Sequence, residues 1–305
     1  MKLGNKISLP HILILLATTA VALLVLFKTV VSAQDFVHTF KSANIYLIFL
    51  AIVVGLSGPF LSALRWKSVL ALSDHHVPFP KAFKVIMGAW PLSILPGRLG
   101  DFARSYPVRK TVPVAASISS TLFEKVVDVS VLILIASIGF LLLKKFIIGF
   151  LLLLGALLFL PTIFLSKHFL RYLPLFISSK LELLFQSFKH ASVIFKKDFF
   201  IALSMSFCNW SASILETWLL YRSFGSLISL SAISAYLPLA IFIGLLPISI
   251  AGIGTRDSAL ISFFKGGASP AQSLAVGLGY TFIGYGLFSI IGIPYLIKEF
   301  GVHEE

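Results

Sequence analysis

Long apolar runs separated by short polar segments dominate this sequence, and seven of the runs approach the roughly 20 residues that a helix needs to cross a bilayer. They lie near 11–31, 44–64, 114–143, 146–165, 199–221, 229–250 and 272–297. The runs do not alternate between apolar and polar residues, which excludes the ~10-residue alternating strands of an outer-membrane barrel. The pattern predicts an all-α, polytopic integral membrane protein with about six to eight transmembrane helices.

Two stretches interrupt this pattern with proline, glycine and an Arg/Asp pair. They are Leu95-Pro-Gly-Arg-Leu-Gly-Asp-Phe-Ala-Arg104, the first break, and Leu246-Pro-Ile-Ser-Ile-Ala-Gly-Ile-Gly-Thr-Arg-Asp257, the second break. Non-helical backbone inside a bilayer is tolerated where protein or a water-filled cavity surrounds it. A helix over 82–97 would be about 24 Å long, shorter than the hydrocarbon core. We therefore predict two re-entrant or broken helices, whose spacing is too dissimilar to establish a repeat.

Charge is scarce and unevenly placed. Hydrophobic residues make up 58% of the 305 residues and charged ones 12%, with a formal net charge of +13. Segment 65–112 carries eight basic and two acidic residues, and segment 167–198 carries six and two, whereas 28–43 carries two and one. By the positive-inside rule the first two segments face the cytoplasm, and so does the N-terminus. The basic excess thus predicts topology, and no nucleic-acid partner is expected.

We expect one membrane domain over 1–305, with pseudo-halves 1–166 and 199–305 and one break in each half. The connector 167–198 mixes aromatic and aliphatic residues with Lys and His, as an amphipathic helix in the membrane interface does. A simple interfacial linker is favoured there, and a lipid-facing gate is the alternative.

The breaks carry the first candidate chemistry. Glycines such as Gly252 and Gly254 permit backbone conformations closed to other residues, and a helix N-terminus placed directly after each break binds anions, above all phosphate. Three arginines add donors with the geometry of phosphate oxygens, namely Arg98, Arg104 and Arg256. Together they predict binding of a phospholipid or polyprenyl phosphate head group. The alternative is that Arg98–Asp101 and Arg256–Asp257 neutralise each other and cap helices.

Carboxylates inside apolar spans are functional candidates by default. Glu124 and Asp128 are four residues apart on one helix face, and they either orient the arginines or carry protons. The alternative is a pair near the cytoplasmic end that is neutralised by Lys125 or by Arg109 and Lys110. Glu216 shares a helical stripe with Asn209 and Ser213, which either lines the same cavity or bonds between helices. Packing or interface anchoring is favoured for four aromatic residues, Trp90, Tyr106, Tyr280 and Tyr285.

Enzymatic signatures do not appear in the sequence. It contains no Walker loop, dinucleotide fingerprint, zinc spacing or nucleophile motif, and the polar loops are short. We expect no cofactor and no metal. A catalytic role is less favoured than a transport role, and ATP hydrolysis within the chain is not expected.

Four sequence elements resemble the flippase-like membrane family that includes the membrane domain of lysylphosphatidylglycerol synthases and the UPF0104 proteins. They are Arg65-Trp66, the two breaks and the Glu124…Asp128 pair, and the resemblance covers most of the chain. Members commonly have Arg after this Glu and end the late motif in Arg-Glu, where this chain has Lys125 and Asp257. The resemblance implies transfer of a polar lipid between leaflets by a stand-alone member, without the synthases' soluble aminoacyltransferase domain.

The leading hypothesis is therefore a translocase, or flippase, for an anionic or phosphate-linked lipid in a bacterial inner membrane. Membrane lipids are the expected partners, with proteins of cell-envelope biosynthesis as further candidates. Two alternatives remain: a membrane-embedded glycosyl or head-group transferase with Glu124 or Asp128 as base, and a non-transporting scaffold of a cell-envelope lipid pathway.

Overall fold

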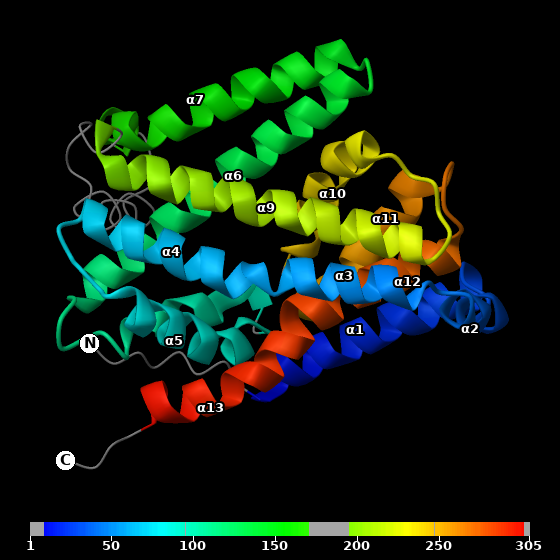
Figure 1. Ribbon diagram of the computed structural model, residues 1–305, viewed down its shortest axis with the longest axis horizontal. Coiled ribbons are helices and arrows are strands. Elements are labelled where there is room, and N and C mark those ends of the chain that lie inside the picture. Colours follow the sequence, from blue (N-terminus) through cyan, green and yellow to red (C-terminus); the bar gives the residue numbers. More distant parts are fainter. Residues whose placement is uncertain (1–8, 95, 171–194, 247, 302–305) are drawn as a thin grey trace.

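Helices and the turns between them make up the whole described part of the chain (Figure 1). The computed structural model describes residues 9–94, 96–170, 195–246 and 248–301. Within these ranges every regular element is a helix, which confirms the predicted all-α class. Most of the predicted connector, 167–198, lies outside the described residues.

The elements before the connector are α1 (Leu9–Thr29), α2 (Ala33–Lys41), α3 (Ile45–Gly55), α4 (Ser57–Leu72), α5 (Phe79–Ala89), the 3₁₀ segments η1 (Trp90–Ile94) and η2 (Pro96–Ser105), α6 (Val114–Leu142) and α7 (Phe146–Leu170). Those after it are α9 (Lys197–Ser223), α10 (Leu230–Gly244), the 3₁₀ turn η4 (Ile250–Gly252), α11 (Thr255–Phe264), α12 (Pro270–Thr281), the π-helical turn η5 (Phe282–Leu287) and α13 (Phe288–Phe300).

Four helical stretches in the described ranges are long and apolar enough to cross a membrane, namely Ile45–Leu72, Val114–Leu142, Lys197–Ser223 and Pro270–Phe300. A fifth span results if α1 and α2, which meet at 93°, count as one broken span. The polytopic architecture is thus as predicted. The span expected over 44–64 continues to Leu72, because α4 follows α3 after a break at Leu56.

The first break folds differently from its prediction. The α-helix expected to reach residue 97 ends at Ala89, and the chain continues through η1 and η2 as tight 3₁₀ coils. These coils pack closely, since a Cβ on Gly100 would collide with the backbone of Leu92. No α-helix begins directly after this break, because 3₁₀ geometry persists to Ser105 and α6 starts only at Val114.

The second break matches its prediction more closely. Beyond α10 the backbone takes left-handed conformations at Ala251 (φ 51°), Gly252 (φ 77°) and Gly254 (φ 89°). Glycine adopts such angles without steric cost, which is why the chain can turn sharply here. The helix α11 then begins at Thr255, immediately after Gly254, as expected.

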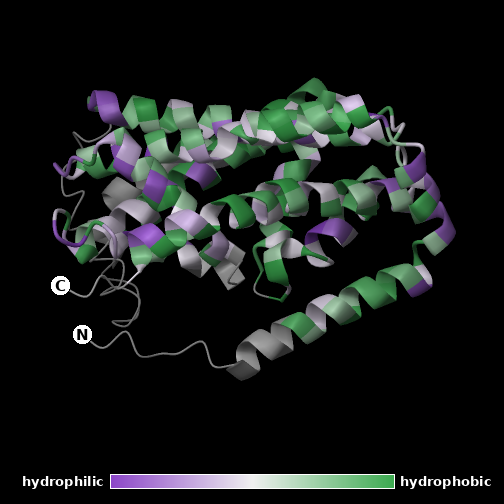
Figure 2. Ribbon diagram, turned by 60° about the horizontal axis from the view of Figure 1, so that its bottom comes forward, coloured by the Kyte–Doolittle hydropathy of each residue, from purple (hydrophilic) through white to green (hydrophobic). Residues whose placement is uncertain are grey.

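Helix α4 packs against α5, α6 and α9, while α13 packs against α5, so segments far apart in sequence form one bundle (Figure 1). Hydrophilic residues gather mainly at the ends of the helices, and apolar ones cover their lengths (Figure 2). Helix α1 supports the second break from outside: the Thr18 hydroxyl donates to the Ile248 carbonyl (2.7 Å), and the Thr19 hydroxyl accepts from the Ile250 amide (2.9 Å).

Candidate functional site

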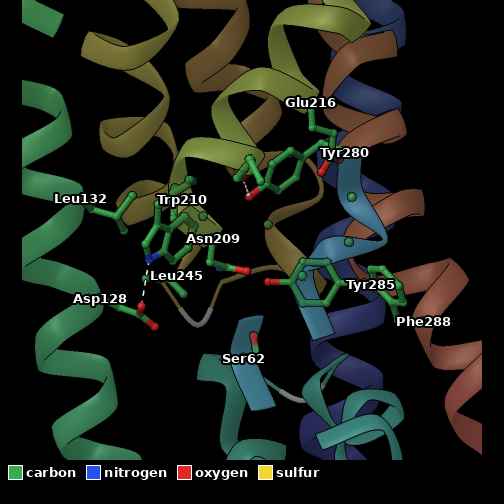
Figure 3. A pocket seen from close by; sticks show the side chains of 18 of the residues that line it. Ser62, Asp128, Leu132, Asn209, Trp210, Glu216, Leu245, Tyr280, Tyr285 and Phe288 are labelled. Atoms are coloured by element: carbon green, nitrogen blue, oxygen red, sulfur yellow. Dashed lines mark hydrogen bonds between the residues drawn. The ribbon is translucent and has the colours of Figure 1, made fainter. Parts of the chain in front are cut away.

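A cavity of about 400 Å³ lies between the two breaks. Phe102 lines it from the first break, and Ala251, Gly252 and Arg256 line it from the second. The remaining walls come from α3, α4, η1, α6, α9, α10, α12, η5 and α13 (Figure 3). Segments separated by about 150 residues therefore enclose a common space.

Buried ion pairs form one side of this site. Arg65 on α4 donates from Nη2 to Glu124 Oε1 (2.7 Å) and from Nη1 to Asp128 Oδ1 (2.6 Å), both on α6. Arg104 on η2 donates to the same Glu124 (3.1 Å to Oε2) and to Asp101 Oδ1 (2.9 Å). Glu124 is thus held between two guanidinium groups. We call Arg65, Asp101, Arg104, Glu124, Lys125 and Asp128 the ionic network.

Neutral donors and a lysine complete the ionic network. Asp128 Oδ1 also accepts from the Ser206 hydroxyl (2.6 Å) and from Trp210 Nε1 (2.9 Å), both on α9. Lys125 Nζ lies 2.5 Å from Asp101 Oδ2. The network holds three cationic and three anionic groups, so its members balance one another and tie α4, η2, α6 and α9 together.

The ionic network favours one of the two alternatives left open by the sequence. Glu124 and Asp128 orient arginines, and Arg104, which is 2% exposed, is engaged by Asp101 and Glu124. Arg104 is consequently a structural cation with little surface for a lipid. The expected Arg98–Asp101 pair cannot be assessed, because the Arg98 side chain lies outside the described residues.

Arg256 stands at the centre of a second cluster, near the start of α11. Its Nη2 donates to Asp257 Oδ1 (2.8 Å), the Gly277 carbonyl (2.7 Å) and the Thr281 hydroxyl (2.6 Å). Its guanidinium lies 4.7 Å from the centroid of the Tyr280 ring. All hydrogen bonds from this side chain to described residues leave from Nη2, and the buried Nε makes none with them.

The N-terminus of α11 is capped from within the chain. Asp257 Oδ2 accepts from the amide of Gly254 (3.0 Å), while its other oxygen accepts from Arg256. An anion at this N-terminus is therefore already present as the Asp257 carboxylate. The helix terminus expected to bind a lipid phosphate already carries this carboxylate, and the Arg256 side chain beside it lines the cavity, as Arg65 and Lys125 also do.

Close packing fixes Asp257, which makes Gly277 a sensitive position. A Cβ added to Gly277 would collide with the Asp257 carboxylate, whereas one added to Gly279, on the same helix, would lie 3.4 Å from Leu220 Cδ1, an ordinary contact. We expect Gly277→Ala to lower the free energy of unfolding in detergent by about 1–3 kcal/mol. Gly279→Ala is the matched control and should change it by less than half as much. Equal effects of the two substitutions would contradict this account of Asp257.

Glu216 projects from α9 into the cavity, as the predicted polar stripe implied. Asn209 and Ser213 line the same cavity, and Ser213 Oγ lies 2.9 Å from the Tyr280 hydroxyl. Glu216 is 6% exposed, and its Oε1 makes no hydrogen bond with any residue that the structure describes. In Figure 3, Asp128 and Trp210 lie toward one end of the view, and Glu216 and Tyr280 toward the other.

Several site residues were not predicted as such. Arg65 was counted among loop bases, yet it is buried in α4 and bridges two carboxylates of α6. Trp90, Tyr280 and Tyr285 were expected to pack or to anchor the interface, and they line the cavity. The Trp90 indole donates to the Gly284 carbonyl (2.7 Å) in the π-turn η5, a geometry frequent at functional sites.

Metal binding finds no support in the described residues. No group of three or more His, Cys, Asp or Glu side chains among them is arranged to hold a metal ion. The carboxylates of the ionic network already bind Arg and Lys side chains. The site therefore offers hydrogen-bond donors, one carboxylate without a hydrogen bond to described residues, and aromatic faces.

Sequence comparisons agree with the resemblance. The model of the family described as lysylphosphatidylglycerol synthase TM region matches residues 12–292. A UPF0104 membrane protein of Methanocaldococcus jannaschii is 24% identical over 290 residues, covering 82% of this chain and 84% of its own length. A UPF0104 membrane protein of Methanothermobacter thermautotrophicus is 34% identical over 95 residues, 30% of this chain and 28% of that protein.

Proposed function

This chain belongs to the family of the lysylphosphatidylglycerol synthase TM region, and from that premise we propose that it moves an anionic or phosphate-linked lipid between the leaflets of the cytoplasmic membrane. The family description associates such domains with synthesis of a phospholipid. The cavity supplies the physical support, because a polar chamber among apolar helices lowers the cost of taking a head group through hydrocarbon.

One observation carries the proposal: Arg256 lines the cavity with a guanidinium whose hydrogen bonds to described residues all use Nη2. A guanidinium presents five N–H donors in a fork that matches two phosphate oxygens. In the proposed mechanism the head group enters the cavity, its phosphate accepts from the remaining donors of Arg256, and the acyl chains stay in lipid.

The orientation that we propose follows from the basic end of the bundle. Lys81 at the start of α5 pairs with Glu299 near the end of α13 (2.6 Å), and Arg109 and Lys298 line the same surface hollow. Basic segments face the cytoplasm under the positive-inside rule. The loop between α4 and α5, the segment between η2 and α6, and the end of α13 would then all be cytoplasmic.

Reconstitution tests the proposal. Purified protein is inserted into vesicles that carry a head-group-phosphate lipid with a fluorescent acyl chain, and a membrane-impermeant reductant bleaches the label in the outer leaflet. Translocation predicts that bleaching proceeds beyond half of the label, at a rate that rises with the protein-to-lipid ratio. Vesicles with an unrelated polytopic protein at the same ratio are the control. A bleaching curve identical to this control would refute the translocase.

A further inference from the structure

Among the described residues, Glu216 is a buried ionisable group that takes no part in the ion pairs described above. Each member of the ionic network is paired, and Arg256 is paired with Asp257. Glu216 forms no ion pair with a described residue, and its Oε1 is buried without a hydrogen bond to one. Burying an unsatisfied carboxylate oxygen is costly, and such groups are rare in native structures. The exception calls for a partner from outside the described part of the chain.

The surroundings of Glu216 leave room for that partner on the cavity side. Behind it the wall is close: a Cβ on Gly55 of α3 would lie 3.2 Å from Glu216 Oε2. Beside it, Tyr280 contacts both Ser213, three residues earlier on α9, and the guanidinium of Arg256. Glu216 on α9 and Arg256 on α11 therefore line the cavity together, and the Tyr280 ring lies beside both helices. Glu216 supplies an acceptor and Arg256 supplies donors.

We propose that Glu216 accepts a hydrogen bond from an O–H or N–H donor of the lipid head group while Arg256 binds the phosphate of the same lipid. This inference rests on the proposed function and names the substrate class: phospholipids, or other lipid phosphates, that carry a hydroxyl or ammonium group next to the phosphate. A carboxyl oxygen without a proton is an acceptor only, so a head group without such a donor leaves this oxygen of Glu216 unsatisfied. A site built to bind a hydrogen-bonding group rejects an analogue that lacks it.

Two charge-matched pairs of lipids test this assignment. Phosphatidylglycerol and phosphatidylmethanol carry the same charge, and the glycerol of the first supplies hydroxyl donors. Phosphatidylethanolamine and phosphatidylcholine are both zwitterionic, and the ammonium of the first supplies N–H donors. We expect wild-type protein to translocate one donor lipid at least about tenfold faster than its matched partner, since the cost of leaving a buried oxygen without a hydrogen bond is at stake. A tenfold ratio in the first pair identifies a hydroxyl as the donor to Glu216, and a tenfold ratio in the second pair identifies an ammonium.

The variant Glu216→Leu should reduce that ratio to about one by slowing the donor lipid alone. Glu299→Gln, a carboxylate far from the cavity at the end of α13, is the matched control and should keep the wild-type ratio. Binding is measured separately in detergent, as the shift in thermal unfolding caused by short-chain forms of the four lipids. Wild-type protein should bind the donor lipid of one pair at least about tenfold more tightly than its matched partner. Glu216→Leu should bind the two lipids of that pair equally.

The outcomes separate the two proposals. If lipids move but both ratios are near one, or if Glu216→Leu leaves them unchanged, the assignment of Glu216 is wrong and the translocase stands. If no lipid moves faster than in control vesicles but detergent binding discriminates through Glu216, translocation is wrong and the site assignment stands. If neither the translocation rates nor binding in detergent differ between the matched lipids, the inference is overturned.

Discussion

Replacing Glu124 by leucine will lower the free energy of unfolding by about 3–5 kcal/mol, because the change leaves two buried guanidinium groups without their shared carboxylate. Glu124 is fully buried, and it accepts from both Arg65 and Arg104. Leucine has a similar size and suits an apolar helix, so the decrease in unfolding free energy results from removal of the carboxylate. Denaturation of purified protein in mixed micelles, followed by circular dichroism, gives the value.

Asp74→Asn provides the control for that experiment. Asp74 forms an ion pair with Lys196 (3.3 Å), but its side chain is 89% exposed. Exposed pairs contribute between zero and about 1 kcal/mol, and asparagine tolerates the left-handed backbone at this position (φ 60°). If Glu124→Leu cost no more than Asp74→Asn, the ionic network would not be a structural clamp.

Replacing Arg256 by alanine will reduce lipid translocation to the level of control vesicles. The substitution removes the guanidinium that faces the cavity, and it also leaves Asp257 without its cation. Arg256→Lys should retain a small fraction of the rate, at most about one tenth, since an ammonium keeps the charge but lacks the planar fork. Initial bleaching rates in the reconstituted vesicles measure both variants.

Arg222→Ala is the matched control for Arg256. Arg222 lies at the end of α9, half-buried, with its guanidinium 5.2 Å from the Trp218 ring centroid, and it does not line the cavity. It tests whether loss of an aromatic-stacked arginine outside the cavity impairs the protein. Folded Arg256→Ala protein with wild-type rates would remove Arg256 from the mechanism.

Hydropathy predicted the class of this fold because bilayer thickness dictates helix length so strongly. Span boundaries were less predictable. Residues 65–72 carry Arg65 and Lys67, which ended the predicted span at 64, yet α4 continues through them to Leu72. The local pattern contains no sign that Arg65 finds carboxylates 59 and 63 residues later in the chain.

The two breaks also show how far the local sequence predicts the candidate site. Glycine and proline located both, and the left-handed angles of Gly252 and Gly254 explain why glycine is needed in the second. The Arg256–Asp257 pair was one of the alternatives that the sequence offered, and the structure contains it. The more distant partners were not predictable, because Arg104 binds a carboxylate of α6 and Arg256 binds a carbonyl and a hydroxyl of α12. Residue types thus marked the candidate chemistry, and the tertiary structure decided which arginine faces the cavity.

The pairing of Arg65 with α6 also bears on the order in which the protein is made. During synthesis α4 emerges from the ribosome dozens of residues before Glu124 and Asp128 exist to balance its guanidinium. An unpaired arginine inside a span raises the insertion free energy by about 2.5–3.5 kcal/mol. We therefore expect stable integration of α4 to wait until α6 has been translated, with these helices entering the lipid as a group rather than one at a time.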